Sequence, residues 1–139
     1  MINTFKVVVS GFVKNENGQL LVVRRSDNEA TFAGRLAIPG GSVESDGTDG
    51  FETDIIEKNL IREIAKETGV NVKVLDWLES SAVVIDGQAK LYLFFSCELI
   101  DDGRNLQTSD ETPEVFWANA DEIDPEACTP PLQKFIQAL

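Results

Sequence analysis

The chain of 139 residues contains no histidine, only two cysteines and five prolines. The absence of histidine excludes zinc sites ligated by histidine and nucleophile pairs in which an imidazole is the base. Cys97 and Cys128 lie far apart and have no CxxC partner, so we expect two reduced thiols rather than a disulfide framework. No segment approaches the roughly eighteen consecutive apolar residues of a membrane helix, and we expect no membrane as a partner. Because histidine is absent, any catalytic chemistry must use carboxylates, Lys, Arg, Tyr or a metal ion held by oxygen.

Positive charge is also scarce, because 12 Lys and Arg oppose 24 Asp and Glu and leave a formal net charge of -12. The basic residues are scattered rather than clustered, so a nucleic-acid polymer is not an expected partner. Any single acidic side chain is expected to be a solvated surface group unless a geometric arrangement singles it out. The first ten residues lack the features of a secretory signal, and the default expectation is a cytoplasmic location.

The length and the 42% hydrophobic content predict one domain over residues 1-139. Apolar runs at Phe5–Val13 and Leu20–Val23 flank turn-forming residues and predict a β-hairpin. Asp86-Gly87 predicts a second hairpin turn. Further strands are expected at 70–78, 82–85, 89–95 and 114–117, and a polar loop is expected at 42–53. A helical turn is expected at 121–123, and a terminal helix is expected to start after Thr129.

Residues 54–68 change to a helical period, with apolar side chains at spacings of three and four: Ile56, Leu60, Ile61, Ile64 and Ala65. Asp54 and Glu57 fit a capping box at the start of this helix. Gly69 fits the left-handed conformation that ends a helix. Hairpins around this central helix, with a second helix at the end, predict a layered α+β fold.

Glu63 and Glu67 are four residues apart, so their carboxylates lie on the same helix face, expected opposite the buried stripe. Two stacked carboxylates that follow a glycine turn suit a hard cation such as Mg²⁺, which prefers oxygen ligands. Taken alone, the helix is better explained by a solvated face on which Glu63 pairs with Lys66.

The glycine turn and the helix together resemble the Nudix box. That pattern is a glycine, five residues, a Glu, seven residues, Arg-Glu, an aliphatic, any residue, Glu-Glu, any residue, Gly and an aliphatic. The matching residues here are Gly41, Arg62, Glu63, Ile64, Glu67, Gly69 and Val70. The preceding strand, which ends in Arg24-Arg25, and the late acids Glu111 and Glu114 are also similar to the family, so the resemblance covers nearly the whole chain.

Three departures from the box stand out. About seven extra residues lie between Gly41 and Arg62, an insertion that an exposed loop absorbs at low cost. The first Glu of the box, counted back from Arg62, is Asp54 here. The first member of the Glu-Glu pair is Lys66, which makes the site more positive and is expected to weaken metal binding.

The resemblance implies an α/β/α sandwich with a mixed sheet, in which the Nudix helix is central and a second helix is C-terminal. It implies a metal-dependent pyrophosphohydrolase that cleaves the phosphoanhydride bond of a nucleoside diphosphate linked to another moiety. Nucleoside triphosphates or ADP-ribose-like compounds are the expected small nucleotide substrates, and Mg²⁺ or Mn²⁺ the expected cofactor. The sequence does not determine the oligomeric state, although a homodimer is the commonest assembly.

By the same resemblance, Glu63 and Glu67 ligate the metal, with a backbone carbonyl of Gly40 or a neighbour adding an oxygen. Arg62 orients the glutamates. Glu111 is the first choice for the general base, because a loop carboxylate can reach the attacking water; Glu114 and Glu63 are the second and third choices.

Candidates for substrate binding also come from the residues around the box, which are Arg24, Arg25, Arg35 and Gly41. The three arginines can grip phosphates bidentately, but each is also explained as an exposed strand or loop charge. Trp77, Tyr92 and Phe95 could stack a base, although aromatic residues in strands are more typical of a core.

Two other functions remain open at this point. In the first, Lys66 has weakened the metal site, and the domain binds or senses a nucleotide without turnover. In the second, an unrelated α+β interaction domain matches the box by chance. Retention of Arg62, Glu63, Glu67 and the Pro-Gly-Gly turn favours the enzyme.

Overall fold

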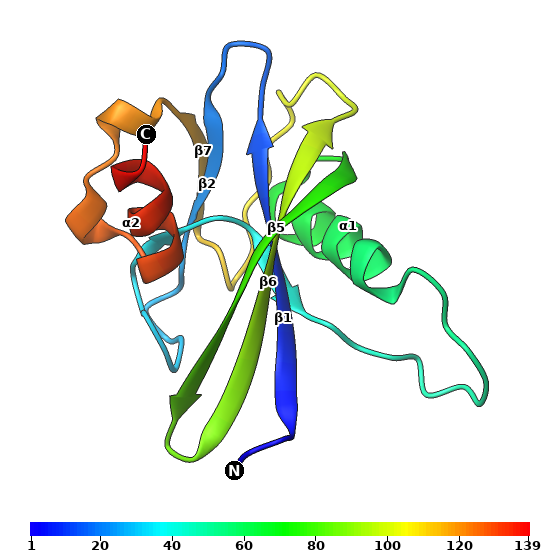
Figure 1. Ribbon diagram of the computed structural model, residues 1–139. Helices are drawn as coiled ribbons and strands as arrows, with labels where there is room; N and C mark the ends of the chain where they lie inside the picture. Colours follow the sequence, from blue (N-terminus) through cyan, green and yellow to red (C-terminus); the bar gives the residue numbers. More distant parts are fainter.

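The computed structural model describes residues 1–139, in which a mixed sheet lies between two helices (Figure 1). The strands are β1 (Phe5–Lys14), β2 (Leu20–Arg24), β3 (Leu36–Ala37), β4 (Gly40–Ser42), β5 (Val72–Ile85), β6 (Gln88–Leu99) and β7 (Glu114–Ala118). The helices are α1 (Ile55–Thr68) and α2 (Pro130–Gln137), with two 3-10 turns at Ala120–Glu122 and Pro125–Ala127. The predicted layered α+β architecture is confirmed.

The central strand of the sheet is β1, which has both parallel and antiparallel neighbours. The strand order is β3-β2-β1-β6-β5, with β4 also paired to β1 and β7 to β2. β1 and β6 are parallel over ten residue pairs from Phe5↔Ala89 to Lys14↔Glu98, whereas the other pairings are antiparallel. β4 and the residues that follow it, 40–44, form the glycine segment. Because β4 pairs antiparallel with β1, this segment is held against the middle of the sheet.

Each face of the sheet has its own apolar core. One core contains Leu60 and Ile64 of α1 packed near Val9, Val13 and other strand residues. The other contains Leu132 of α2 together with residues of β1, β2 and β6. The two helices therefore cover opposite faces, as Figure 1 shows, and no helix has the length and apolar character needed to cross a membrane.

Both predicted hairpins are confirmed. β1 and β2 are antiparallel neighbours, and β5 and β6 join at Asp86-Gly87, where both residues have positive φ (53° and 77°). The two strands expected at 70–78 and 82–85 are instead one strand, β5, whose register shifts around Trp77. Ladder hydrogen bonds with β6 continue across the polar residues that had indicated a break.

The helix prediction was right in extent and wrong in two details. Asp54 occupies the N-cap position with φ 57°, and its side chain makes no capping hydrogen bond. This left-handed backbone differs from the extended conformation in which a side chain caps the first turn. Ile61, which had been grouped with the buried stripe, is 37% exposed. Gly69 ends the helix with φ 77°, as expected.

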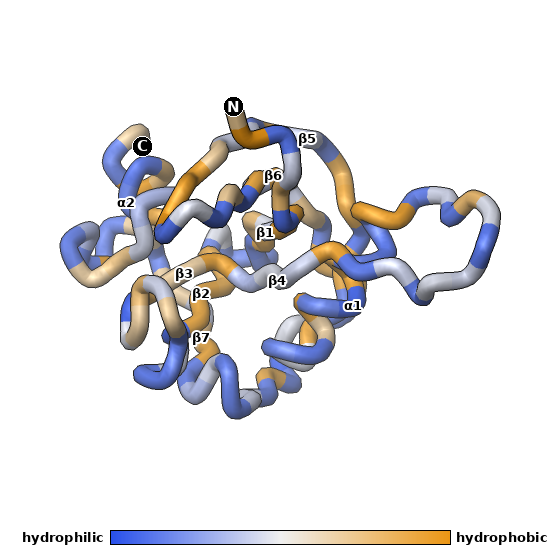
Figure 2. The backbone as a smooth tube through the Cα atoms, turned by 90° about the horizontal axis from the view of Figure 1, so that it is seen from below, coloured by the Kyte–Doolittle hydropathy of each residue, from blue (hydrophilic) through white to orange (hydrophobic).

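The segment between β4 and α1 leaves the body of the molecule as an extended loop (Figures 1 and 2). Residues 44–54 are exposed, and Phe51 among them is fully exposed. Hydrogen bonds within the loop link near neighbours, such as Ser45 with Glu52 and with the amide of Gly47. The insertion expected from the box is therefore accommodated outside the packed layers.

Candidate functional site

The glycine segment and α1 come into direct contact through Glu67. Its Oε1 accepts a hydrogen bond of 3.1 Å from the amide of Gly40. A Cβ on Gly40 would lie 2.0 Å from the carbonyl oxygen of Val9, so only glycine lets this strand approach β1 so closely. The Pro-Gly-Gly turn thus brings backbone polar groups to the helix carboxylates.

Glu63 occupies the next position along the same contact. A Cβ on Gly41 would lie 2.5 Å from Glu63 Oε2, so the missing side chain creates the space that this carboxylate occupies. The two glutamates are 9% and 6% exposed, which corrects the expectation that they lie on the solvent face opposite the buried stripe. The reason is that α1 is covered on this face by the glycine strand, which a sequence periodicity does not show.

The electrostatics around Glu67 are those of an uncompensated carboxylate. Burial raises the pKa of Glu67 to about 8, and the negative charges of Glu63 and Glu111 add to the rise. The Gly40 amide and the more distant Arg25 lower the pKa only in part. A bound cation would remove this conflict by neutralising the crowded carboxylates.

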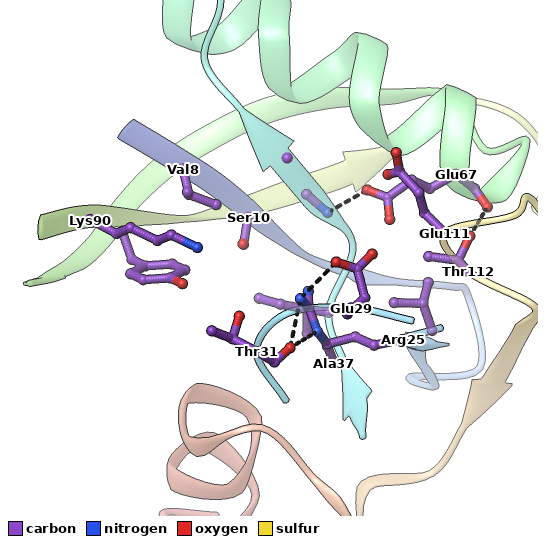
Figure 3. A pocket seen from close by; sticks show the side chains of 15 residues that line it. Val8, Ser10, Arg25, Glu29, Thr31, Ala37, Glu67, Lys90, Glu111 and Thr112 are labelled. Atoms are coloured by element: carbon purple, nitrogen blue, oxygen red, sulfur yellow. Dashed lines mark hydrogen bonds and ion pairs between the residues drawn. The ribbon is translucent and has the colours of Figure 1, made fainter. Parts of the chain in front are cut away.

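Glu111 reaches the site on a loop that is attached to α1. Thr112 Oγ1 donates a 3.0 Å hydrogen bond to the carbonyl oxygen of Glu67, and the Gln107 amide donates to the carbonyl of Thr68 at 2.8 Å. The carbonyl of Glu111 accepts from the Ser26 amide at 3.0 Å. These hydrogen bonds attach the loop both to α1 and to Ser26, which follows β2. Glu111 lines the same cleft as Glu67 (Figure 3).

Arg25 is the arginine that the structure brings into this cleft. Its guanidinium donates to the carbonyl of Thr31 at 2.9 Å and 3.1 Å and contacts Glu29 at 3.4 Å. These contacts hold the guanidinium in the cleft next to Glu29 and Thr31, where Figure 3 shows it. Gly40 and Gly41 line the same cleft.

The remaining predicted residues lie elsewhere or at its edge. Arg24 pairs with Glu114 at 2.8 Å, so the second choice for a general base is engaged away from the cleft. Arg35 donates to the carbonyl of Glu126. Arg62 is on the exposed side of Glu63, with Nη2 3.6 Å from Glu63 Oε1, and it does not line the cleft.

The sequence interpretation gave no role to Lys90, and it treated Tyr92 as more typical of a core than of base stacking. Lys90 and Tyr92 of β6 both line the cleft, and Figure 3 shows Lys90 on the side opposite Glu67. No motif marks them, because they are brought there only by the parallel pairing of β1 and β6. Phe95 is in the core as expected, whereas Trp77 is 62% exposed on β5.

An apolar hollow of about 250 Å³ adjoins the cleft. Tyr92 lines both spaces, and the aromatic rings of Phe32 and Phe94 line the hollow next to the start of α2. Phe32 has φ 52°, an uncommon conformation for a bulky residue. The cleft and hollow together offer a charged part and an aromatic part.

The donor set fits a hard divalent cation. Glu63 and Glu67 supply carboxylate oxygens, and no group of three acidic, cysteine or histidine side chains converges as a metal cage. Mg²⁺ uses one or two carboxylates and keeps several waters or substrate oxygens, so two side chains are enough. The position of the Glu63 carboxylate against Gly41 and the raised pKa of Glu67 are consistent with such an ion.

Known proteins resemble this chain in sequence. A "MutT-like protein" of Streptomyces ambofaciens is 34% identical over 117 residues, which are 84% of this chain and 66% of that protein. A "Nucleoside triphosphatase NudI" of Salmonella typhimurium is 27% identical over 129 residues, 85% of this chain and 84% of that protein. The chain thus spans slightly less than two thirds of the Streptomyces relative.

A solved structure shows the same fold. The MutT protein from Methanosarcina mazei Go1 superposes with a TM-score of 0.76 at 20% identity, covering 99% of this chain and 94% of that one. It supports the predicted α/β/α sandwich with a mixed sheet. The family model described as NUDIX domain matches residues 4–139. The resemblance seen in the sequence is thereby confirmed, and the chain belongs to the Nudix family.

Proposed function

We propose that this protein is a divalent-metal-dependent pyrophosphohydrolase that cleaves the phosphoanhydride bond of a nucleoside diphosphate linked to another moiety. The observation that carries the proposal is the placement of Glu63 against Gly41 and of Glu67 against Gly40. Glu67 lines a cleft that is also lined by Glu111 and by the positively charged side chains of Arg25 and Lys90. Family membership and the names of the relatives support the enzyme class. A nucleoside triphosphate or an ADP-ribose-like compound is the proposed substrate.

Glu63 and Glu67 would hold Mg²⁺ or Mn²⁺, with a backbone oxygen near Gly40 as a further ligand. The ion would supply neutralisation of phosphate charge and polarisation of the bond that breaks. Glu67 has to lose its proton to bind the ion, because a protonated carboxyl is a poor ligand. Gly40 favours that loss by donating its amide to the carboxylate.

Glu111 is proposed as the general base. It is exposed, it lies in the same cleft as Glu67, and its loop is fixed to α1 through Thr112. A carboxylate in this position can accept a proton from water that attacks a phosphorus atom in the cleft. Glu114 is a poorer choice, since its carboxylate pairs with Arg24.

The nucleotide would lie across the cleft with its charged and aromatic ends separated. Arg25 and Lys90, on two walls of the cleft, are suited to the phosphate oxygens. The hollow beside Tyr92, with Phe32 and Phe94, is suited to the base, because aromatic rings stack on flat heterocycles. Arg24 and Arg35, which are bound elsewhere, are not given a role.

The alternative is a domain that binds a nucleotide without turnover. Two observations favour it: Lys66 replaces a carboxylate of the box, and no three acidic side chains converge on a metal cage. The enzyme remains the better proposal, because a pocket used only for binding does not require buried Glu63 and Glu67 beside glycines.

A panel of nucleoside triphosphates and nucleoside diphosphate sugars tests both. The protein is incubated with Mg²⁺ or Mn²⁺, and products are separated by ion exchange. Release of a nucleoside monophosphate from at least one compound, absent with EDTA, is the expected result. Binding of a compound without any product, in wild type and in Lys66→Glu, would favour the sensing domain instead.

A further inference from the structure

Asn59 is a buried amide on α1 whose hydrogen-bonding capacity is fully used. It is 2% exposed. Its Nδ2 donates to the carbonyls of Ile55 at 2.7 Å and Glu44 at 3.2 Å. Its Oδ1 accepts from the Glu44 amide at 3.0 Å and from Arg62 Nη2 at 2.5 Å. A side-chain amide offers two donors and one oxygen with two lone pairs, and all four are occupied.

Asn59 extends the face of α1 that carries the two glutamates. Residues 59, 63 and 67 are spaced by four, so they lie one above another along the helix. Each meets the chain that runs past α1: Glu67 accepts from the Gly40 amide, Glu63 fits the space at Gly41, and Asn59 binds both backbone groups of Glu44. The segment 40–44 therefore contacts the helix at three successive points, by hydrogen bonds at Gly40 and Glu44 and by packing at Gly41.

Asn59 also restrains the arginine beside the site. Arg62 has a side chain that is 53% exposed, and its Nη2 lies between Asn59 Oδ1 and Glu63 Oε1, 3.6 Å from the latter. An exposed arginine without such a partner would sample many rotamers. The contact with Asn59 keeps the guanidinium where it faces Glu63.

We propose that Asn59 is a positioning residue for the carboxylate site, because it fixes the register of residues 40–44 against α1 and holds Arg62 beside Glu63. The inference rests on the proposed function for its catalytic consequence, although the structural part stands without it. Asn59 does not line the cleft, and among the predicted site residues it contacts Arg62. Its effect passes through Arg62 and through the glycine segment.

A second consequence concerns the inserted loop. Residues 45–53 follow directly after Glu44, and they are exposed. Asn59 holds the backbone of Glu44 on both its amide and its carbonyl. We expect these two contacts to keep motion of the loop from reaching Gly40 and Gly41.

The test compares Asn59→Ala and Asn59→Asp with wild type. Asn59→Ala removes all four contacts, whereas Asn59→Asp keeps the two acceptor contacts and loses the two donor contacts. Asn15→Ala is the matched control, because Asn15 makes three hydrogen bonds that fix the β1–β2 turn away from the site. All measurements are made below the unfolding temperature of each variant.

The first readout is hydrogen exchange of the Gly40 amide in metal-free protein, followed by NMR. Asn59→Ala is expected to accelerate this exchange by about 10-fold or more, with β5–β6 amides unchanged and Asn59→Asp intermediate. Asn15→Ala should leave the Gly40 amide as in wild type. Unchanged Gly40 exchange in Asn59→Ala, or equal acceleration of β5–β6 amides, would overturn the proposal whether or not the protein turns over a nucleotide.

The second readout is kinetic, on the substrate found in the panel. Asn59→Ala is expected to lower kcat by roughly 10- to 100-fold and to raise the half-activating Mg²⁺ concentration, while KM changes by no more than about 2-fold. Asn59→Asp should recover most of kcat through its contact with Arg62. Equal kcat in Asn59→Ala and wild type would show that Asn59 is only structural. Absence of turnover in wild type would instead count against the proposed function, and Gly40 exchange would still decide the role of Asn59.

Discussion

At the scale of single residues, Glu67 couples proton binding to stability. Its pKa in the folded, metal-free protein is about 8, above the ordinary value of 4.5, mainly because it is buried. Between these two pH values the folded state binds more protons than the unfolded state, so stability falls as pH rises. Metal-free protein is therefore expected to lose on the order of a few kcal/mol of stability from pH 5 to pH 8.5, measured by urea unfolding.

The matched variant for this prediction is Glu67→Gln, which keeps the shape and cannot ionise. Its stability should change less over the same pH range, because the proton that links folding to pH is gone. Mg²⁺ should restore wild-type stability at pH 8.5 and have little effect on Glu67→Gln. Parallel pH profiles for the two proteins would contradict the assignment of the raised pKa to Glu67.

Replacement of Gly41 by alanine is expected to impair activity, whereas replacement of Gly40 is expected to impair stability. In Gly41→Ala the new Cβ meets the flexible end of Glu63, so turnover should fall by roughly 10-fold or more while the fold is kept. In Gly40→Ala the new Cβ meets the backbone of β1, so stability should fall by about 2 kcal/mol or more. Thermal unfolding and kcat are measured on both. Similar losses of stability in both variants would show that Gly41 is also needed for folding.

The side chains at the site were only partly predictable. Glu63, Glu67 and Gly41 followed from the box, but their burial did not, because it depends on a strand that packs over the helix. Arg24 and Arg35 were plausible phosphate ligands in sequence and are occupied by Glu114 and by a backbone carbonyl. A sequence without coordinates cannot reveal such partners, which come from distant strands and turns.

At the scale of secondary-structure elements, the inserted loop is expected to be dispensable. Its hydrogen bonds are mainly local, and Asn59 holds the chain where the loop begins. Replacing residues 46–52 by two glycines should therefore leave kcat within about 2-fold of wild type, since a shorter loop has a small closure cost. Circular dichroism checks the fold. A large loss of kcat in a folded variant would show that the loop contributes to the site.

Elements with strong local signals were predicted well, and elements formed by tertiary pairing were not. The period of α1 and its stop at Gly69 were visible, as was the Asp86-Gly87 turn. β4 was not, because Gly40–Ser42 has no strand propensity and exists through its pairing with β1. Asp54 had the right residue type for a cap, yet its backbone took a left-handed conformation.

At the scale of the whole molecule, the strand pairing and the distribution of charged residues together determine the character of the cleft. Parallel pairing of β1 with β6 brings Lys90 and Tyr92 to the cleft, and the loop before β7 brings Glu111. Within a chain of net charge -12, Arg25 and Lys90 are the cations that line this cleft. Under the proposed function, an anionic substrate would depend on these two residues and on a metal ion to offset the surrounding negative charge.

The central claim is that Glu63 and Glu67 hold a divalent ion that is required for phosphoanhydride cleavage. The most direct measurement is nucleoside monophosphate release against Mg²⁺ concentration for wild type, Glu67→Gln and Glu114→Gln at pH 8.5. We expect saturable activation of wild type and Glu114→Gln, and a fall of about 100-fold or more in Glu67→Gln, with all three folded. Equal, metal-activated turnover in Glu67→Gln and wild type would contradict the central claim.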